Sequence, residues 1–191
     1  MKIGVLALQG DFYLHIKRLQ ELGVTAVEVR KPEELQDCQG LILPGGESTT
    51  LVKLMKNIGL FDAIKDFAKK YPLFGTCAGC ILVSKEVTNQ QVESLNLINI
   101  VTERNAYGRQ IDSFVDLVKV ELMERQFEIE GVFIRAPKII KAEDSVRVLG
   151  VHGDEIVLVE EGNVLAATFH PELSEEKIIH EYFLEKVKAS I

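Results

Sequence analysis

The chain has 191 residues, of which 47% are hydrophobic, enough apolar material for one core, and we expect a single domain over residues 1–191. Its 29 acidic and 22 basic residues are scattered and give a net charge of -7, which argues against the basic stripe of a nucleic-acid-binding protein. The apolar runs are shorter than the ~20 residues of a membrane span. Three cysteines are typical of a reducing compartment, so we expect a cytoplasmic protein that binds neither nucleic acid nor membrane.

The first half of the chain alternates buried strand patterns with amphipathic helix patterns. Strand patterns are found at 3–8, 24–29, 41–46 and 72–76, and helix patterns at 12–22 and 48–58. Parallel neighbours need crossover connections, which helices supply in this order. The series therefore predicts an α/β fold, a three-layer sandwich with a mostly parallel central sheet of the flavodoxin-like kind.

After about residue 95, strand patterns follow one another with few helices between them. They are found at 115–122, at 131–137 and in a run from 146 to 170 that Gly153 and Gly162 divide into three. We therefore expect additional antiparallel strands in the C-terminal half. A last helix is predicted from Ser174, which can cap it, with acidic residues in its first turn.

The stretch FGTCAGC at 74–80 contains two cysteines, Cys77 and Cys80, spaced as in a redox pair or half a metal site. It also has the pattern Gly-x-Cys-x-Gly between a strand and a helix start, the cysteine counterpart of a nucleophile elbow. Such a turn places the thiol at a helix N-terminus, which favours the thiolate, and aims the N–H of Ala78 at a developing oxyanion. On this interpretation Cys77 reacts and Cys80 packs into the core. A redox pair, a metal site and structural thiols stay as alternatives.

His170 and Glu172 follow a predicted strand in the sequence Phe-His-Pro-Glu. At a strand end, residues i and i+2 point the same way, so Glu172 can bind one ring nitrogen of His170 while the other faces a thiol. We therefore predict Cys77 as the nucleophile, His170 as the general acid and base, and Glu172 as the residue that orients the histidine. An ordinary loop histidine is the alternative. Surface or packing roles are expected for the other histidines, which have no comparable neighbour: His15, His152 and His180.

A second glycine-containing loop, LILPGGEST at 41–49, ends a strand and leads into a predicted helix. In an open α/β sheet this loop and the nucleophile turn lie at the same edge, where the strands have their carboxyl ends. Glycine lets the backbone approach a substrate closely, and one N–H, assigned to Gly46, can complete an oxyanion hole with Ala78. The alternative is a tight turn with a helix cap at Glu47 or Ser48. The loop lacks Gly-Lys-Ser/Thr, so nucleotide binding is not supported.

Three arginines stand in or beside loops of the second half: Arg104, Arg109 and Arg135. A solvated surface charge is the ordinary role for each of them. Near a cleft, however, the guanidinium suits an α-carboxylate because it binds both oxygens at once. The arginines are therefore candidates for holding an amino-acid substrate.

The chain resembles the class I, triad-type glutamine amidotransferases in six segments: LQGDFYLH, LILPGGESTT, FGTCAGC, RNAYGRQIDSF, VFIRAP and FHPEL. GTCAG with a distant HPE is specific for that class. PGGEST together with RNxxGRQxDSF is similar to the glutaminase subunits of pyridoxal 5′-phosphate synthase, in the deoxyxylulose-independent route to vitamin B6. The resemblance extends from residue 1 to about residue 185.

The resemblance implies hydrolysis of L-glutamine to L-glutamate and ammonia by Cys77, His170 and Glu172 in the roles given above. It implies glutamine-binding roles for six residues: Gly46, Glu47, Ser48, Arg104, Ile134 and Arg135. No cofactor and no metal are implied. The ammonia is expected to pass to a separate synthase subunit, which builds pyridoxal 5′-phosphate from ribose 5-phosphate and glyceraldehyde 3-phosphate.

The sequence departs from the resembled pattern at Cys80, where a larger apolar residue is usual. The predicted triad is unaffected, but the region then holds a second oxidisable thiol. Two other functions stay as alternatives. One is a cysteine hydrolase or stress protein of the DJ-1/PfpI type, and the other is a non-catalytic redox or regulatory module.

Overall fold

Five parallel strands form the centre of the sheet in the computed structural model, which describes residues 1–89, 91–105 and 113–191. Their order is β2-β1-β3-β4-β12, with bounds Lys2–Leu6 (β1), Thr25–Val29 (β2), Gly40–Leu43 (β3), Leu73–Thr76 (β4) and Val164–Ala167 (β12). The four inner strands are buried along nearly their whole length, as strands covered on both faces should be. The strand series predicted for the first half is confirmed.

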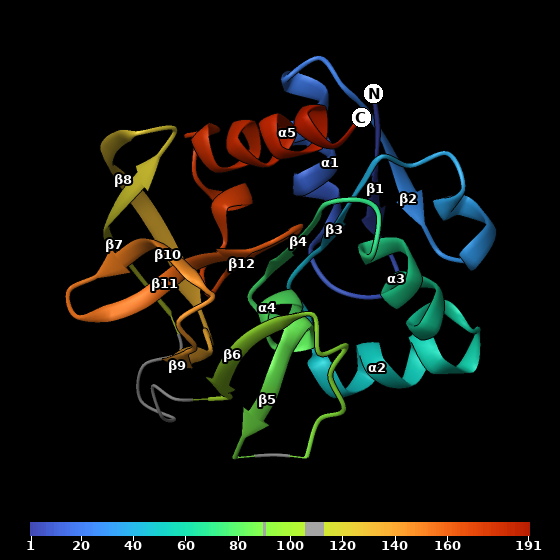
Figure 1. Cartoon of the computed structure of the whole chain (residues 1–191), viewed down its shortest axis with the longest axis horizontal. Helices are drawn as coiled ribbons and strands as arrows, with labels where there is room; N and C mark the ends of the chain where they lie inside the picture. The colour runs from blue at the N-terminus through green and yellow to red at the C-terminus, as the bar shows by residue number, and fades with distance from the viewer. Residues whose placement is uncertain (90, 106–112) are drawn as a thin grey trace.

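Antiparallel strands extend the sheet beyond β12. The order continues β12-β11-β10-β7-β8, with bounds Ser113–Leu122 (β7), Arg125–Ile134 (β8), Arg147–His152 (β10) and Glu155–Glu161 (β11). A smaller group branches off through the pairing of β9 with β11: β5 (Ser84–Thr88), β6 (Ile98–Glu103) and β9 (Lys138–Ala142). The sheet is therefore mixed and curled, parallel at its centre and antiparallel in the C-terminal half (Figure 1).

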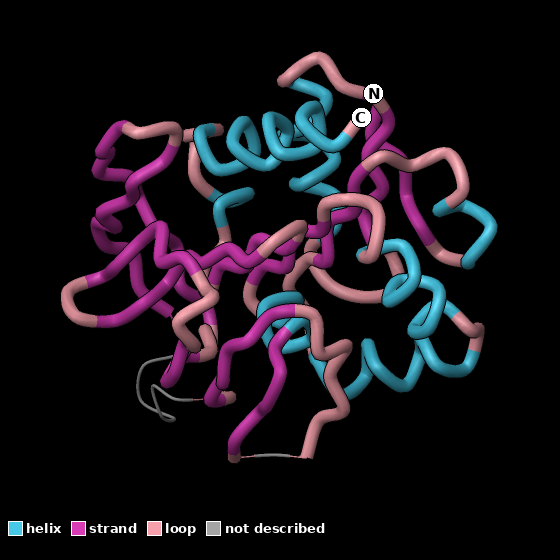
Figure 2. Tube along the Cα trace, viewed as in Figure 1, coloured by secondary structure: helices cyan, strands magenta, loops and turns pink. Residues whose placement is uncertain are grey.

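Helices cover both faces of the parallel strands (Figures 1 and 2). One face carries α1 (Phe12–Glu21) and α5 (Ile178–Ser190), and the other carries α2 (Ser48–Asn57), α3 (Leu60–Ala68) and α4 (Ala78–Val83). Two 3-10 helices, η1 (Pro32–Leu35) and η2 (Pro171–Leu173), lie in connections. Along β3, Leu41 and Leu43 pack into the core beneath α2 and α3, while Ile42 packs into the core beneath α1 and α5. The three-layer prediction is confirmed.

The last helix begins later than the sequence predicted. Ser174 ends η2 in an extended conformation, so α5 begins only at Ile178. The hydroxyl of Ser174 still accepts a hydrogen bond from the N–H of Glu176 at 3.2 Å, which is a local turn contact and not a helix cap. The sequence analysis did not predict α3, β5, β6 or β9, although the buried residues of α3 have regular helical spacing.

Four connecting segments meet at one edge of the sheet. They follow the carboxyl ends of β1, β3, β4 and β12, which are parallel neighbours. The segments are LQGD after β1, PGGES after β3, the turn at Cys77 after β4, and Phe-His-Pro-Glu after β12. Ligands of open α/β sheets bind at this edge. The topology therefore gathers segments that are far apart in the sequence.

Candidate active site

The turn at Cys77 is a strained backbone feature of this edge. Strand β4 runs directly into Cys77, which has φ 50° and ψ −107°, and α4 follows at once. A positive φ is uncommon for a residue with a Cβ and clusters at functional sites. The flanking glycines make the turn possible, because a Cβ on Gly75 would lie 2.4 Å from the carbonyl oxygen of Gly79, and one on Gly79 would lie 1.9 Å from that of Leu43. This geometry is that of a nucleophile elbow.

His170 stands between β12 and η2 at the same edge. Its backbone N–H donates to the carbonyl of Val132 at 2.8 Å, and its Nδ1 lies 2.7 Å from Oε1 of Glu172. A carboxylate only accepts hydrogen bonds, so Nδ1 carries the proton and Nε2 of the neutral ring presents a lone pair. Burial opposes a charge on the ring, but Cys77 and Glu172 outweigh it and raise the pKa of His170. Burial likewise opposes the charge of Glu172, whose pKa is lowered by His15 and His170.

Cys77 and His170 approach each other beside Gly45. A Cβ on this glycine would lie 2.6 Å from Cε1 of His170 and 3.4 Å from Cβ of Cys77. The thiol of Cys77 is 3.7 Å from the carbonyl oxygen of Ile134, at the end of β8. Nε2 of His170 has no hydrogen-bond partner in the part of the chain that the structure describes. Nε2 therefore has no competing partner there for the exchange of a proton with Cys77, which helps to raise the pKa of His170.

Glu47 caps α2, which is the alternative role that the sequence left open for it. Its carboxylate accepts hydrogen bonds from the N–H groups of Thr49 and Thr50 at 3.2 and 2.7 Å, and it pairs with Nη2 of Arg104 at 2.5 Å. Burial raises the pKa of Glu47, but the bonds from the two threonines lower it, with a net fall to about 2. The carboxylate is thus engaged within the loop, and a substrate contact of Glu47 would have to use its backbone.

The segment after β1 supports the glycine loop, a contact that sequence reasoning missed. Oε1 of Gln9 accepts a hydrogen bond from the N–H of Glu47 at 2.8 Å, and the N–H of Asp11 donates to the carbonyl of Gly45 at 3.3 Å. In a trans peptide the N–H points opposite to the carbonyl, so the N–H of Gly46 points away from Asp11. The proximity of the two loops is a consequence of the pairing of β1 with β3, which one sequence does not reveal.

The remaining predicted residues lie around the turn at Cys77. Ser48 is the first residue of α2, and its buried hydroxyl has no hydrogen-bond partner among the described residues. Ile134 ends β8 and contacts the thiol through its carbonyl, and Arg135 follows with a φ of 44°. Arg109 and the other residues of 106–112 lie outside the described residues.

Cys80 occupies an environment unlike that of Cys77. It lies in α4 and is completely buried, and burial raises the pKa of its thiol. All three cysteines of the chain are free thiols. The interpretation of Cys80 as a packing residue is therefore supported, and the C-x-x-C spacing forms no disulfide in this structure.

The expectation for His15 and His180 was incomplete, because both belong to the neighbourhood of Glu172. Each is completely buried, and Nε2 of His15 lies 3.2 Å from Oε2 of Glu172. Nδ1 of His15 lies 3.0 Å from Nε2 of His180. They stand on α1 and α5, more than 150 residues apart in the sequence, and no local pattern links them. His152 does lie nearer the surface, paired with Asp116 at 3.0 Å.

A family profile described as the SNO glutamine amidotransferase family matches residues 5–189. The chain belongs to this glutamine amidotransferase family. It is 51% identical over 189 residues to a protein of Thermosipho africanus named pyridoxal 5′-phosphate synthase subunit PdxT, covering 98% of this chain and 100% of that one. A protein of the same name from Brevibacillus brevis is 49% identical over 189 residues and covers 98% of each chain.

Solved structures agree with this membership of the glutamine amidotransferase family. A crystal structure of a glutamine amidotransferase is 45% identical, with a TM-score of 0.92, and covers 97% of this chain and 98% of that one. The structure of PurLQS from Thermotoga maritima has a TM-score of 0.71 at 19% identity, covering 100% of this chain and 96% of that one, which shows a shared fold. Within the described residues, no helix is both long and apolar enough to cross a bilayer.

Proposed function

We propose that this chain hydrolyses L-glutamine to L-glutamate and ammonia and supplies the ammonia to a synthase subunit that makes pyridoxal 5′-phosphate. The relatives named as PdxT subunits support the assignment, and so does membership of the amidotransferase family. The observation that carries the chemistry is the pairing of His170 with Glu172 at 2.7 Å, beside Cys77 on a strained turn.

In the proposed first half-reaction, His170 takes the proton of the Cys77 thiol, and the sulfur attacks the side-chain amide carbon of glutamine. A C–S bond forms, and the carbonyl electron pair moves to oxygen, which the N–H groups of Ala78 and Gly46 stabilise. The C–N bond then breaks, and nitrogen leaves as ammonia with a proton from His170. Glu172 holds the ring and balances its positive charge during this transfer.

The second half-reaction restores the cysteine. His170 removes a proton from water, which attacks the thioester carbon, and the C–S bond breaks. Glutamate leaves, and Cys77 regains its proton. Overall, one glutamine and one water give one glutamate and one ammonia, so no oxidant or cofactor is needed.

Glutamine binding is assigned to the residues gathered around the turn. The backbone of Gly46, Glu47 and Ser48 faces the amide end, and Arg104 and Arg135 are the candidates for the α-carboxylate. Ile134 borders the thiol through its carbonyl, 3.7 Å from Sγ of Cys77. The pairing of Arg104 with Glu47 at 2.5 Å brings that arginine to the glycine loop, which supports its role.

Ammonia transfer to a docked synthase subunit follows from the chemistry of the product. Free ammonia is mostly protonated at neutral pH and is then no nucleophile, so an enclosed route protects it. The cytoplasmic location stays a prediction, supported by the three free thiols.

The assignment is tested by measuring glutamate released from glutamine, with and without the cognate synthase subunit. Wild-type chain should release glutamate in the complex, and Cys77→Ala should not. Absence of glutamate release by the wild-type complex would refute the proposal.

A labelling experiment separates this function from a DJ-1/PfpI-type hydrolase or stress protein. A chloroketone analogue of glutamine should label Cys77, and free glutamine should protect it. The matching analogue of norvaline, which lacks the amide-like end, should label poorly. Equal labelling by both, without protection by glutamine, would favour the alternative enzyme.

A further inference from the structure

Glu172 and three further buried side chains, from four elements in all, meet behind His170. Nε2 of His15, on α1, lies 3.2 Å from Oε2 of Glu172 and 3.1 Å from Oγ1 of Thr76. Nδ1 of His15 lies 3.0 Å from Nε2 of His180, on α5. All four side chains are completely buried. The reaction described above uses only Glu172 of this cluster and assigns no role to the other three side chains.

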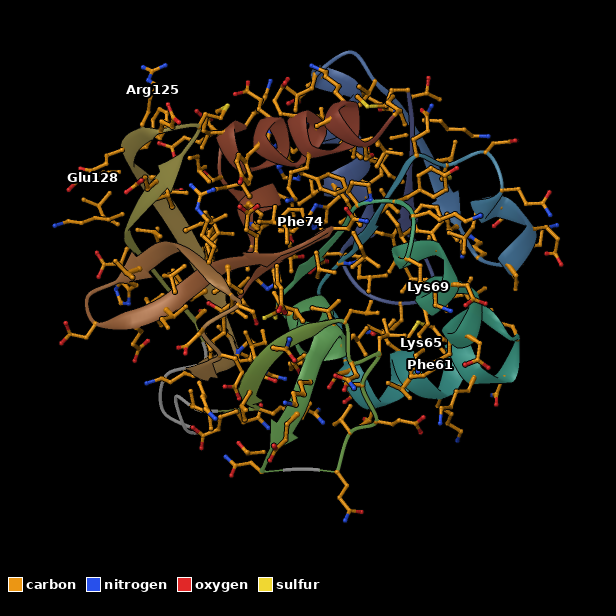
Figure 3. The ribbon with its side chains drawn as sticks, in the orientation of Figure 1. Phe61, Lys65, Lys69, Phe74, Arg125 and Glu128 are labelled. Carbon is orange, nitrogen blue, oxygen red and sulfur yellow. The ribbon has the colours of Figure 1, made fainter. Side chains whose placement is uncertain are left out.

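An aromatic ring packs against both histidines. The ring of Phe74, on β4, meets His15 edge-on at 6.5 Å and His180 edge-on at 6.2 Å, measured between ring centroids. Figure 3 shows Phe74 in the interior, between the strands and α5. Polar groups buried in such a place are costly unless they are paired, so the protons of the two rings must be placed consistently.

The carboxylate of Glu172 favours one arrangement of protons on the two rings. If Nε2 of His15 had no proton, its lone pair would face the carboxylate of Glu172, and the two would repel. Nε2 of His15 is therefore the protonated nitrogen, and Nδ1 is an acceptor. The donor to that acceptor is then Nε2–H of His180. Nδ1 of His180 is left without a proton, and it has no hydrogen-bond partner in the described part of the chain.

Oε2 of Glu172 has no hydrogen-bond partner among the described residues, and Nε2 of His15 is the polar group that faces it. We propose that His15 is a positioning residue of the active site, whose Nε2–H bonds to Thr76 and faces the carboxylate of Glu172, and that His180 fixes the tautomer of His15 that makes this possible. Thr76 directly precedes Cys77, and Glu172 orients His170. His15 therefore connects the backbone that holds the nucleophile to the carboxylate that holds the base. The inference deepens the proposed function and rests on it.

The neutral state of His15 matters for this role. A neutral donor supports the carboxylate of Glu172 and leaves its negative charge for His170, whereas a cationic ring would compete with His170 for that charge. Burial lowers the pKa of His15, and the adjacent His170 adds to this, although Glu172 opposes it. Burial lowers the pKa of His180 to about 3. Five ionisable groups surround this pair of histidines. Asp11 and Arg18 belong to α1 and the residue before it, His170 and Glu172 follow β12, and His180 lies on α5.

The first test is nitrogen-15 NMR of the histidine rings in the full chain, because the two ring nitrogens differ in chemical shift with and without a proton. His15 and His180 should both be neutral and carry the proton on Nε2 at pH 7. A proton on Nδ1 of His15, or a cationic His15, would overturn the proposal. This measurement needs no substrate and no partner.

The second test compares His15→Phe with His15→Gln in the complex. Phenylalanine fills the space without a donor, whereas the amide of glutamine places a donor near the former Nε2. We expect His15→Phe to lower kcat about tenfold with KM changed by less than about twofold, and His15→Gln to recover most of the loss. His180→Phe should cost about threefold, because His15 keeps a donor but loses the fixed tautomer. His152→Gln is the matched control and should behave as wild type.

The pH profile of Cys77 alkylation by iodoacetamide, measured on the full chain, separates this inference from the proposed function. Without His15, Glu172 is held less firmly and stabilises the imidazolium of His170 less well. The thiolate of Cys77 then forms only at higher pH, so the rise of alkylation with pH should shift to higher pH in His15→Phe. The profile of His152→Gln should not shift. The inference is overturned if both His15 variants have the alkylation profile and the kcat of the wild type. If the wild-type complex releases no glutamate, the proposed function fails, and the ring tautomers and alkylation profile still decide the role of His15. If His15→Phe does not fold, the role of His15 is decided by the kinetics of His15→Gln and by the ring tautomers of the wild-type chain.

Discussion

Cys77 and Cys80 are close in sequence but lie in regions of opposite character, the turn after β4 and the body of α4. The turn holds Cys77 at a φ of 50°, beside His170 and the glycine loop. The helix holds Cys80 completely buried, where desolvation raises the pKa of its thiol. Neither thiol is bonded to the other. The difference shows that the local backbone, and not the spacing of the cysteines, selects which thiol can react.

The turn is maintained by close packing of backbone on backbone. A Cβ on Gly79 would lie 1.9 Å from the carbonyl oxygen of Leu43, so β3 and α4 are in direct contact there. This contact also brings the glycine loop after β3 next to Cys77. Gly79, one of the two glycines that allow the turn, therefore also helps to assemble the site around it.

The largest effect is expected from removing the reactive thiol. Cys77→Ala should lower glutamate release by the complex at least about 10³-fold, because no other group at the turn can form the thioester. The measurement is a coupled glutamate assay with wild type and Cys80→Ala alongside. If Cys80→Ala loses activity and Cys77→Ala keeps it, Cys80 and not Cys77 is the reactive thiol.

A smaller but substantial effect is expected from closing the space at the turn. Gly79→Ala should destabilise the fold by about 3 kcal/mol, because the new Cβ overlaps backbone that cannot move aside. Urea unfolding followed by circular dichroism measures this. Gly59→Ala is a suitable control, since Gly59 lies at the start of α3 with a φ of 75°, and its added Cβ meets nothing within 4 Å. The control should cost about 1 kcal/mol, from its positive φ alone. Equal losses in the two variants would argue against tight packing at the turn.

The charged pair beside Cys77 should give the stability of the fold an acid dependence. The pKa of Glu172 is lowered from an ordinary value of 4.5 to about 2, so the unfolded chain takes up this proton first as the pH falls. The resulting stabilisation is present above about pH 4.5 and is lost progressively as the pH falls towards 2. The stability difference between wild type and Glu172→Gln should therefore shrink between pH 6 and pH 3 in urea titrations. A difference that stays constant over this range would contradict the assignment.

The smallest effect is expected at the buried thiol. Cys80→Ala should keep glutamate release within about twofold of wild type and cost about 1 kcal/mol of unfolding free energy, because it removes one buried sulfur from the core. The two assays named above measure both quantities. A large kinetic effect with little loss of stability would give Cys80 a chemical role after all.

Much of the fold was accessible from local patterns because its parallel strands are short, apolar and separated by amphipathic helices. The Gly-x-Cys-x-Gly turn and Phe-His-Pro-Glu were recognisable for the same reason, since each packs its chemistry into a few adjacent residues. α3 was missed although its buried residues, Leu60, Phe61, Ile64 and Phe67, have helical spacing, and β5, β6 and β9 were missed as short strands of five or six residues. The start of α5 was placed too early because Ser174 is a good cap in sequence, while Pro171 and the extended backbone at Ser174 delay the helix.

By itself, the sequence determined which short segments could hold a nucleophile, a base and an orienting carboxylate, because these depend on neighbours within a few positions. Only the tertiary structure decided that Gln9 braces the glycine loop and that His15 and His180 lie behind Glu172. Those contacts join β1 to β3 and α1 to α5, and their energetics arise from burial, which depends on the whole sheet and both of its covering layers. A histidine that looks ordinary in its own helix becomes part of the site once water is excluded from around it.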